Sequence, residues 1–414
     1  MAKIAYILLC HKDPEAVVKQ ARRLTTAGDY MAIHFDASAD PTHFNEIKTA
    51  LADNPNVTFA RKRIRCGWGE WSLVQATLNA VEAAVDAFPR ATHFYMLSGD
   101  CMAIKSAEYI HGFLDENDAD FIESFDYFES DWIKTGMREE RLIYRHFFNE
   151  RTNKRLFYAA LNLQRKLGLT REVPADVQVQ IGSQWWCLRR RTIEWVLEFT
   201  RTRRDVMRFF RTTWIPDETF FQTIVRHVVP ENEIRSRTLT FLMFTDYGMP
   251  VTFYDDHYDL LISQDYLFAR KISPDADDLK RRLGLLYSAQ GVQFQISNEG
   301  RSLFKFLTGR GRIGRRFATR FWETESTLGR EVLLGVPLGV DGLFRNFQVG
   351  RTLRTELADG TGPGAGLQEL AGGKSIAVGQ VIANRIPVDH QRTRFAHVST
   401  RRVADLYLAD VEHV

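Results

Sequence analysis

Two adjacent acids, Asp217 and Glu218, are the residues of this chain best suited to catalysis. Pro216 comes immediately before them and an aromatic, apolar run follows, which is typical of a turn that opens a helix. A carboxylate held by such a turn could remove a proton from an incoming hydroxyl group as a general base. The competing interpretation is an ordinary helix start, because acids in the first turn stabilise the positive end of the helix dipole.

The elements that must position these acids show a regular rhythm in the first hundred residues. Four short apolar runs predict strands: 4–9, 30–36, 56–60 and 93–97. Apolar residues at helical spacing fill 72–88 and stop at Pro89. Strands that alternate with helices predict βαβ units, and so an α/β fold with a mostly parallel central sheet covered on both faces.

Polar side chains follow three of the predicted strands. His11 follows the first strand, Asp36 ends the second, and Asp100 comes after the fourth. In open α/β sheets, ligands bind beyond the carboxyl ends of the strands. We therefore expect these three side chains to line one cleft despite their separation in the sequence.

Seven segments, in this order, resemble the core-2/I-branching β-1,6-N-acetylglucosaminyltransferases and peptide-O-xylosyltransferases, a family of inverting glycosyltransferases. The segments are 4–11 (IAYILLCH), 33–36 (IHFD), 67–79 (GWGEWSLVQATLN), 94–100 (FYMLSGD), 182–188 (GSQWWCL), 216–221 (PDETFF) and 267–271 (LFARK). The resemblance implies a GT-A-type nucleotide-sugar-binding fold, which agrees with the α/β pattern. No counterpart is found for the chain beyond residue 296.

The resemblance implies a catalytic role for three residues. Glu218 matches the base of a transfer from a UDP-sugar to a glycan hydroxyl, with N-acetylglucosamine as the first expectation for the sugar and xylose as the second. Arg270 and Lys271 match basic residues that stabilise the leaving diphosphate in place of a divalent ion, so neither a metal nor another cofactor is expected. Read without the resemblance, Arg270 and Lys271 could equally be a solvated pair on a helix surface.

Further residues are assigned to the donor sugar nucleotide by the same resemblance, beside His11. Asp36 matches a residue that contacts the uracil ring, and Trp68 falls where some members have a tyrosine beside the nucleotide. Asp100 matches an acid at the donor edge of the site. Core packing is the competing role for Trp68, and capping of the next helix is the competing role for Asp100.

The acceptor is expected on the other side of Glu218. Glu123, Arg138 and Arg141 resemble acceptor-contacting positions of the branching enzymes, and a surface salt-bridge network is the competing interpretation. Trp185 and Trp186 could offer a flat apolar face to a sugar ring or fill the core. We expect one of the two to take each role.

Metal binding is not expected from the acid pairs of this chain. Both 118–120 and 275–277 read Asp-x-Asp, a pattern that can hold a metal diphosphate, but neither follows an apolar strand. The first pair sits among further acids and reads as a solvated loop. We therefore predict no metal site.

Length and composition favour a globular protein with two domains. At 414 residues, the chain is longer than one average domain, and we expect a glycosyltransferase domain over 1–295 and a C-terminal extension of unknown role over 296–414. A formal net charge of +3 is too small to indicate a nucleic-acid-binding protein. Four scattered cysteines and the lack of an apolar run of bilayer length predict a cytoplasmic protein with reduced thiols.

The segment 301–320 carries basic residues interleaved with Leu and Phe and has no acid. Such a pattern could bind an anionic membrane surface, an anionic polysaccharide or a phosphorylated lipid carrier. The competing interpretation is a solvated helix whose apolar stripe packs on the catalytic domain. We expect a bacterial enzyme of surface-polysaccharide synthesis, peripheral to the inner membrane. The alternative function is a non-catalytic carbohydrate- or polyanion-binding protein that retains the fold.

Overall fold

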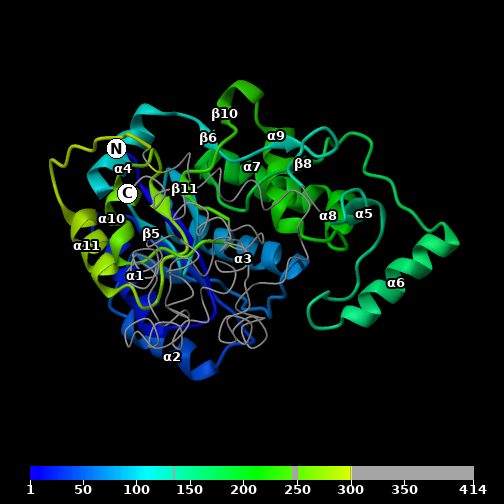
Figure 1. Cartoon of the computed structure of the whole chain (residues 1–414), viewed down its shortest axis with the longest axis horizontal. Coiled ribbons are helices and arrows are strands. Elements are labelled where there is room, and N and C mark those ends of the chain that lie inside the picture. The colour runs from blue at the N-terminus through cyan, green and yellow to red at the C-terminus, as the bar shows by residue number, and fades with distance from the viewer. Residues whose placement is uncertain (134–135, 245–249, 299, 301–414) are drawn as a thin grey trace, which may run out of the picture. The chain divides into compact units, whose positions relative to one another are not determined.

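The computed structural model describes residues 1–133, 136–244, 250–298 and 300 (Figure 1). The chain divides into two compact units, and we call the first, Met1–Phe241 with Asp255–Asn298, the main unit. The second comprises Leu242–Tyr254 and Glu299–Val414. All the site residues predicted above lie in the main unit. The basic segment 301–320, and all of the predicted extension except 296–298 and 300, lie outside the described residues.

A seven-stranded sheet forms the centre of the main unit. Its strands are, in spatial order, β10 (Ile234–Arg235), β6 (Asp120–Phe121), β9 (Cys187–Arg189), β4 (His93–Ser98), β1 (Ile4–Cys10), β2 (Tyr30–Phe35) and β3 (Val57–Phe59). The pairs among β4, β1, β2 and β3 are parallel, whereas β9 runs antiparallel to both of its neighbours. The prediction of an α/β fold with a mostly parallel sheet is confirmed, and the four predicted strands match β1 to β4 closely.

Helix α3 (Trp71–Ala87) covers the predicted run 72–88 and packs on β1, β2 and β3. Its buried face includes Ala76, Ala80 and Ala84, spaced four residues apart along one side of the helix. Such small side chains let the helix lie close to the sheet. Helix α3 therefore fixes the loop that precedes it, which carries Trp68.

Further helices and two small sheets complete the main unit (Figure 1). The other helices are α1 (Pro14–Thr25), α2 (Pro41–Ala50), α4 (Ala107–Glu116), α5 (Glu140–Ile143), α6 (Lys154–Leu167), α7 (Arg190–Thr202), α8 (Arg204–Phe210), α9 (Phe220–Val228), α10 (Tyr258–Ile262) and α11 (Asp277–Ser288). A three-stranded sheet consists of β11 (Thr240–Phe241), β12 (Phe268–Ala269) and β5 (Met102–Ala103), and a two-stranded sheet of β7 (Phe125–Asp126) and β8 (Gln180–Ile181). Within the part of the chain that the structure describes, no helix combines the length and apolar character needed to cross a bilayer.

One interpretation of the acid-rich segment 115–120 is wrong. Asp120 is fully buried in β6 and does not lie in a solvated loop. Its carboxylate accepts hydrogen bonds from the backbone and guanidinium of Arg189 and from the hydroxyl of Thr192. Arg189 comes from the neighbouring strand β9, so a partner distant in the sequence compensates for the burial of this charge.

Candidate active site

The carboxyl ends of β2, β1 and β4 meet at one edge of the central sheet. In the strand register, Cys10 lies opposite Phe35 and Leu9 lies opposite Ser98. His11, Asp36 and Asp100 therefore follow neighbouring strands, which are about 4.8 Å apart. The three residues thus lie at one edge of the sheet, while the expectation that they line one cleft and bind the donor stays a prediction.

Asp100 lies between two lysines at this edge. Lys12 Nζ lies 3.4 Å from one carboxylate oxygen of Asp100, and Lys271 Nζ lies 3.9 Å from the other. The next helix, α4, is capped by Ser106, so the helix-capping interpretation of Asp100 is wrong. Burial and the neighbouring charge of Arg270 lower the pKa of Lys271. Lys12 was missed at the sequence level, although it directly follows His11.

Arg270 is held against an aromatic ring. Its guanidinium carbon lies 4.1 Å from the ring centre of Trp185, which is 3% exposed. The buried Nε of Arg270 has no hydrogen-bond partner among the described residues. With Lys12, Lys271 and one acid, Asp100, this gives a cationic cluster with an unused donor, as an anionic ligand requires. Neither residue lies in a helix, and Arg270 packs on Trp185, so a solvated pair on a helix surface is the wrong interpretation of Arg270, while the side chain of Lys271 stays 39% exposed.

Glu218 lies on the proline-led turn that was predicted. The short 3₁₀ helix Pro216–Glu218 follows Ile215, which has a left-handed backbone with φ of 54°, and precedes α9. This conformation is unfavourable for a β-branched residue, and the backbone N–H of Ile215 donates to the carbonyl of Gly69 at 2.9 Å. The turn thus presents Glu218 from a constrained position.

Arg141 contacts the predicted base directly. Its Nη1 donates to Glu218 Oε2 at 3.1 Å, and the side chain of Arg141 is buried while that of Glu218 is 33% exposed. Arg141 was assigned to the acceptor by resemblance, whereas in this structure it orients the carboxylate. The pairing spans 77 positions of the sequence, which is why local patterns could not reveal it.

The segment 182–186 connects the predicted base to the cationic cluster. The N–H of Gly182 donates to the backbone carbonyl of Glu218 at 2.9 Å, and Trp185 carries the guanidinium of Arg270. Three residues of chain span at most about 11 Å. The turn with Glu218 and the arginine therefore flank a single short stretch of backbone at the carboxyl end of β4.

Two further acids lie beside this stretch. Glu123 accepts a hydrogen bond from the backbone of Ser183 at 3.2 Å, and burial raises its pKa. Burial and the adjacent Glu218 charge raise the pKa of Asp217 to about 7, and its buried Oδ1 has no partner within the described residues. The sequence placed Asp217 beside the predicted base but could not show its burial, which depends on the surrounding fold.

Asp36 and Trp68 occupy different environments. Asp36 is 7% exposed and accepts hydrogen bonds from the backbone and hydroxyl of Ser38, both at 2.7 Å, and from the backbone of Cys66. Trp68 is 41% exposed, and the guanidinium of Arg151 lies 3.9 Å from its ring centre. Core packing is therefore wrong for Trp68, whose ring is available at the surface.

Two of the predicted acceptor residues, Arg138 and Trp186, have structural roles. The guanidinium of Arg138 donates to the carbonyls of Phe128 and Ser130, and so holds its own neighbouring loop. Trp186 is 1% exposed and packs on Phe221 with ring centres 5.0 Å apart. Trp186 is thus the core tryptophan of the pair, and we remove it from the acceptor site. Trp185 is also buried and faces Arg270, so a sugar platform is wrong for it too.

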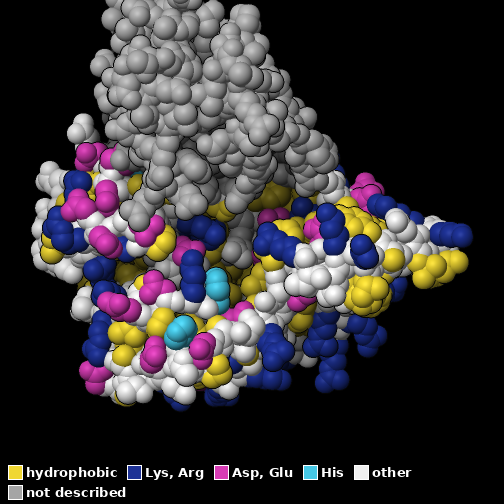
Figure 2. All heavy atoms as spheres, turned by 60° about the horizontal axis from the view of Figure 1, so that its bottom comes forward, with side chains coloured by type: hydrophobic (Ala, Val, Ile, Leu, Met, Phe, Trp, Pro, Cys, Tyr) yellow, Lys and Arg dark blue, Asp and Glu magenta, His cyan; other side chains and the backbone are white. Residues whose placement is uncertain are grey.

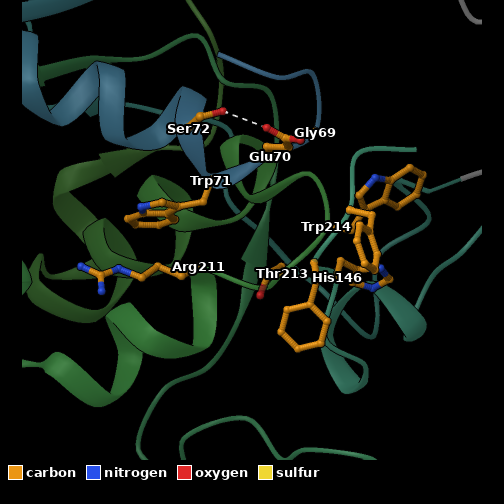
Figure 3. A pocket seen from close by; sticks show the side chains of 10 residues that line it. Gly69, Glu70, Trp71, Ser72, His146, Arg211, Thr213 and Trp214 are labelled. Carbon is orange, nitrogen blue, oxygen red and sulfur yellow. Dashed lines mark hydrogen bonds between the residues drawn. The ribbon is translucent and has the colours of Figure 1, made fainter. Parts of the chain in front are cut away.

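A pocket of about 230 Å³ lies beside Trp214, a neighbour of Arg141 (Figure 3). Its lining is aromatic and polar: 69–72, 146–148, Arg211, Thr213 and Trp214. Figure 3 shows Glu70 and Ser72 on one side, and His146 and Trp214 on another. The buried Nε1 of Trp214 has no partner in the described ranges, and the guanidinium carbon of Arg141 lies 5.3 Å from the Trp214 ring centre. The pocket therefore adjoins the residue that orients Glu218.

His146 is an uncharged member of this pocket. Burial lowers its pKa to about 4, and one ring nitrogen, Nε2, lies 2.8 Å from the carbonyl of Glu140. Since the carbonyl is an acceptor, Nε2 carries the proton and Nδ1 is an acceptor. Phe147 and Phe148 beside it are 63% and 39% exposed. The pocket thus combines exposed rings with hydrogen-bonding groups.

Among the residues with assigned positions, no group of three or more His, Cys, Asp or Glu side chains is placed to hold a metal ion. Metal independence stays a prediction. All four cysteines are free thiols, with Cys66 half-buried and the other three buried.

Comparison with known proteins places these features in a family. The family model described as "Core-2/I-Branching enzyme" matches residues 4–257, and one described as a family of unknown function (DUF5928) matches 270–351. Xylosyltransferase 2 of Homo sapiens is 28% identical over 245 residues, covering 57% of this chain and 25% of the human protein. Xylosyltransferase oxt of Drosophila melanogaster is 26% identical over 201 residues, covering 47% of this chain and 21% of the fly protein.

The similarity extends to a second kind of transferase. Beta-1,3-galactosyl-O-glycosyl-glycoprotein beta-1,6-N-acetylglucosaminyltransferase 3 of Ovis aries is 25% identical over 225 residues, which are 54% of this chain and 47% of the sheep protein. The chain thus spans about a quarter of the xylosyltransferases and about half of the sheep enzyme. Since its model matches more than half of the sequence, the chain belongs to the Core-2/I-Branching enzyme family.

Proposed function

We propose that this protein is an inverting glycosyltransferase that moves a sugar from a UDP-sugar to a glycan hydroxyl without a metal ion. The proposal rests on two contacts of the stretch 182–186. Gly182 is hydrogen-bonded to the turn that bears Glu218, and Trp185 packs on Arg270 of the cationic cluster. A carboxylate base and a cationic site for the leaving diphosphate, both held by one short stretch of backbone, are the two parts such a reaction needs.

In the proposed reaction, the Glu218 carboxylate removes the proton of the acceptor hydroxyl. The acceptor oxygen forms a bond to the anomeric carbon on the face opposite the diphosphate, and the bond from that carbon to the phosphate oxygen breaks. UDP leaves with the electron pair, so one base is sufficient and the configuration inverts. Arg141 keeps the Glu218 carboxylate oriented through their 3.1 Å ion pair.

Arg270, Lys271 and Lys12 supply the positive charge for the departing diphosphate. The guanidinium can donate two parallel hydrogen bonds to phosphate oxygens, while the lysines act as compact charges. Trp185 holds the guanidinium before the ligand arrives, which lowers the ordering cost of binding. Asp100 keeps both lysines at the edge of the sheet.

The identity of the sugar is the finer part of the proposal. Relatives named as xylosyltransferases and as an N-acetylglucosaminyltransferase support these two donors. We propose N-acetylglucosamine first and xylose second, with Asp36 and Trp68 beside the nucleotide.

The pocket beside Arg141 provides a place for the acceptor glycan. Pyranose rings bind to aromatic faces through their C–H groups and to carboxylate, guanidinium and indole N–H groups through their hydroxyls. Phe147 and Phe148 offer such faces, and Glu70, Arg211 and the unpaired Nε1 of Trp214 offer such groups. We therefore assign the pocket to a sugar unit of the acceptor near the reacting hydroxyl.

Replacing Glu218 by Gln tests the proposal. The variant should lose transfer by about 10²- to 10⁴-fold, the usual contribution of a general base, while UDP still raises its melting temperature in the presence of EDTA. Transfer at the wild-type rate would remove Glu218 from the mechanism. If UDP and UDP-sugars fail to stabilise the wild-type protein, a non-catalytic carbohydrate-binding role takes precedence.

A further inference from the structure

Helix α6 exposes a stripe of leucines to solvent. Leu156, Leu163 and Leu167 are 53%, 56% and 58% exposed, and their spacing of seven and four residues places them on one face of the helix. Gly168 ends the helix with a left-handed backbone, and Leu169, 50% exposed, follows at once. Four large apolar side chains at one location are unusual for a surface that only contacts water.

A different face of α6 attaches it to the main unit. Phe157, Leu161 and Gln164 are buried, and Phe157 stacks on His146 with ring centres 5.2 Å apart. The amide group of Gln164 exchanges two hydrogen bonds of 2.9 Å with the backbone of Arg145. The leucine stripe is therefore a second apolar face, and packing within the main unit does not account for it.

The charges of α6 have one sign only. The helix contains four basic residues and no acid: Lys154, Arg155, Arg165 and Lys166. At about 100° per residue, Arg155 and Lys166 lie roughly 90° around the helix from the leucine stripe. Arg165 forms an ion pair with Glu140 at 3.1 Å, on the side that faces the main unit. The exposed leucines are thus bordered by positive charge.

Helix α6 lies at the edge of the main unit, where its leucines and basic residues can reach a partner. Figure 1 shows α6 extending away from the sheet of the main unit, connected to it by loops. Figure 2 shows hydrophobic and Lys or Arg side chains side by side at that end of the unit. Helix α6 therefore lies at the periphery of the main unit.

We propose that α6 binds an anionic lipid membrane. Leu156, Leu163, Leu167 and Leu169 enter the boundary between headgroups and acyl chains, and Arg155 and Lys166 contact lipid phosphates. A soluble polyanion would engage the basic residues but leave the leucines in water. A second copy of the chain, packed through the leucine stripe, would bring Arg155 and Lys166 near the same two basic residues of its partner. The anionic bilayer satisfies both features of the helix.

The test uses the full chain and vesicles of phosphatidylcholine with or without phosphatidylglycerol. Wild-type protein should sediment with the anionic vesicles only. The triple variant Leu156→Gln, Leu163→Gln, Leu167→Gln keeps good helix formers and should bind at least about tenfold more weakly, since apolar burial drives insertion. Leu285→Gln is the matched control, because Leu285 is 64% exposed on another helix, α11.

Hydrogen–deuterium exchange separates α6 from any other basic segment. Anionic vesicles should slow exchange in the peptide covering 154–169 of the wild-type protein. Circular dichroism confirms that the triple variant is folded. Unchanged binding of the triple variant, unchanged exchange in 154–169, or no binding of wild-type protein to anionic vesicles would each overturn the proposal. Wild-type transfer activity in detergent-free solution is expected for the triple variant, so this test is independent of the proposed function.

Discussion

Replacing Arg270 by Met tests the cationic cluster quantitatively. The guanidinium is held 4.1 Å from the Trp185 ring centre and has a buried, unpaired Nε in the described structure. A bidentate contact with phosphate consists of two charge-assisted hydrogen bonds, each with a net contribution of about 1.5–3 kcal/mol. Allowing for partial replacement by water, we expect a loss of about 2–4 kcal/mol, or roughly 30- to 1000-fold in the Kd of UDP.

The assay is isothermal titration of UDP in EDTA. Met keeps an apolar contact with Trp185, so the fold should be retained. Arg270→Lys should fall between wild type and Arg270→Met, because it keeps the charge and loses the planar fork. Arg237→Met is the matched control: Arg237 also lies over an aromatic ring, 5.3 Å from the centre of Tyr266, and pairs with Asp265 away from this edge. A wild-type Kd for Arg270→Met would refute the placement of the diphosphate.

Three other outcomes follow from the site. Burial and the charge of Glu218 raise the pKa of Asp217 to about 7. The contribution of this carboxyl group to the free energy of unfolding is therefore complete below its pKa in the unfolded state and is lost as the pH rises through 7. Asp217→Asn should raise the melting temperature above pH 7 more than at pH 5, and a shift independent of pH would contradict this. A Cβ at Gly182 would lie 2.0 Å from the carbonyl oxygen of Glu123, so Gly182→Ala should abolish transfer. A Cβ at Gly112, within helix α4, meets nothing within 4 Å. Gly112→Ala should therefore stabilise the protein by up to about 1 kcal/mol in denaturant unfolding. In the pocket that we propose for the acceptor, Phe147→Ala should raise the acceptor KM with an unchanged Kd for UDP, and an altered Kd for UDP would argue against this assignment.

The central sheet could be predicted because its signals are local. The runs that form β1, β2 and β4 are continuous and apolar, as expected for parallel strands buried on both faces. Their order along the chain and the polar residues that follow them were enough to place His11, Asp36 and Asp100 at one edge.

What could not be predicted depends on partners far apart in the sequence. Asp120 lies among solvated acids in the sequence, and only the pairing of β6 with β9 brings Arg189 to it. The same holds for Arg141, whose partner Glu218 is on another element. Trp185 was expected to face a sugar or the core, and no local pattern could show that Arg270 covers its ring. Such pairings arise from the tertiary fold, so the types of the residues were informative and their partners were not.

The stretch 182–186 has a kinetic consequence. The backbone of this stretch holds the Glu218 turn at Gly182, and the side chain of Trp185 holds the guanidinium that we propose for the diphosphate. A nucleotide bound to Arg270 would add to this restraint and steady the peptide to which the turn is attached. We expect a compulsory order of association, in which the sugar nucleotide enters first and the hydroxyl substrate second, and in which spent UDP departs last.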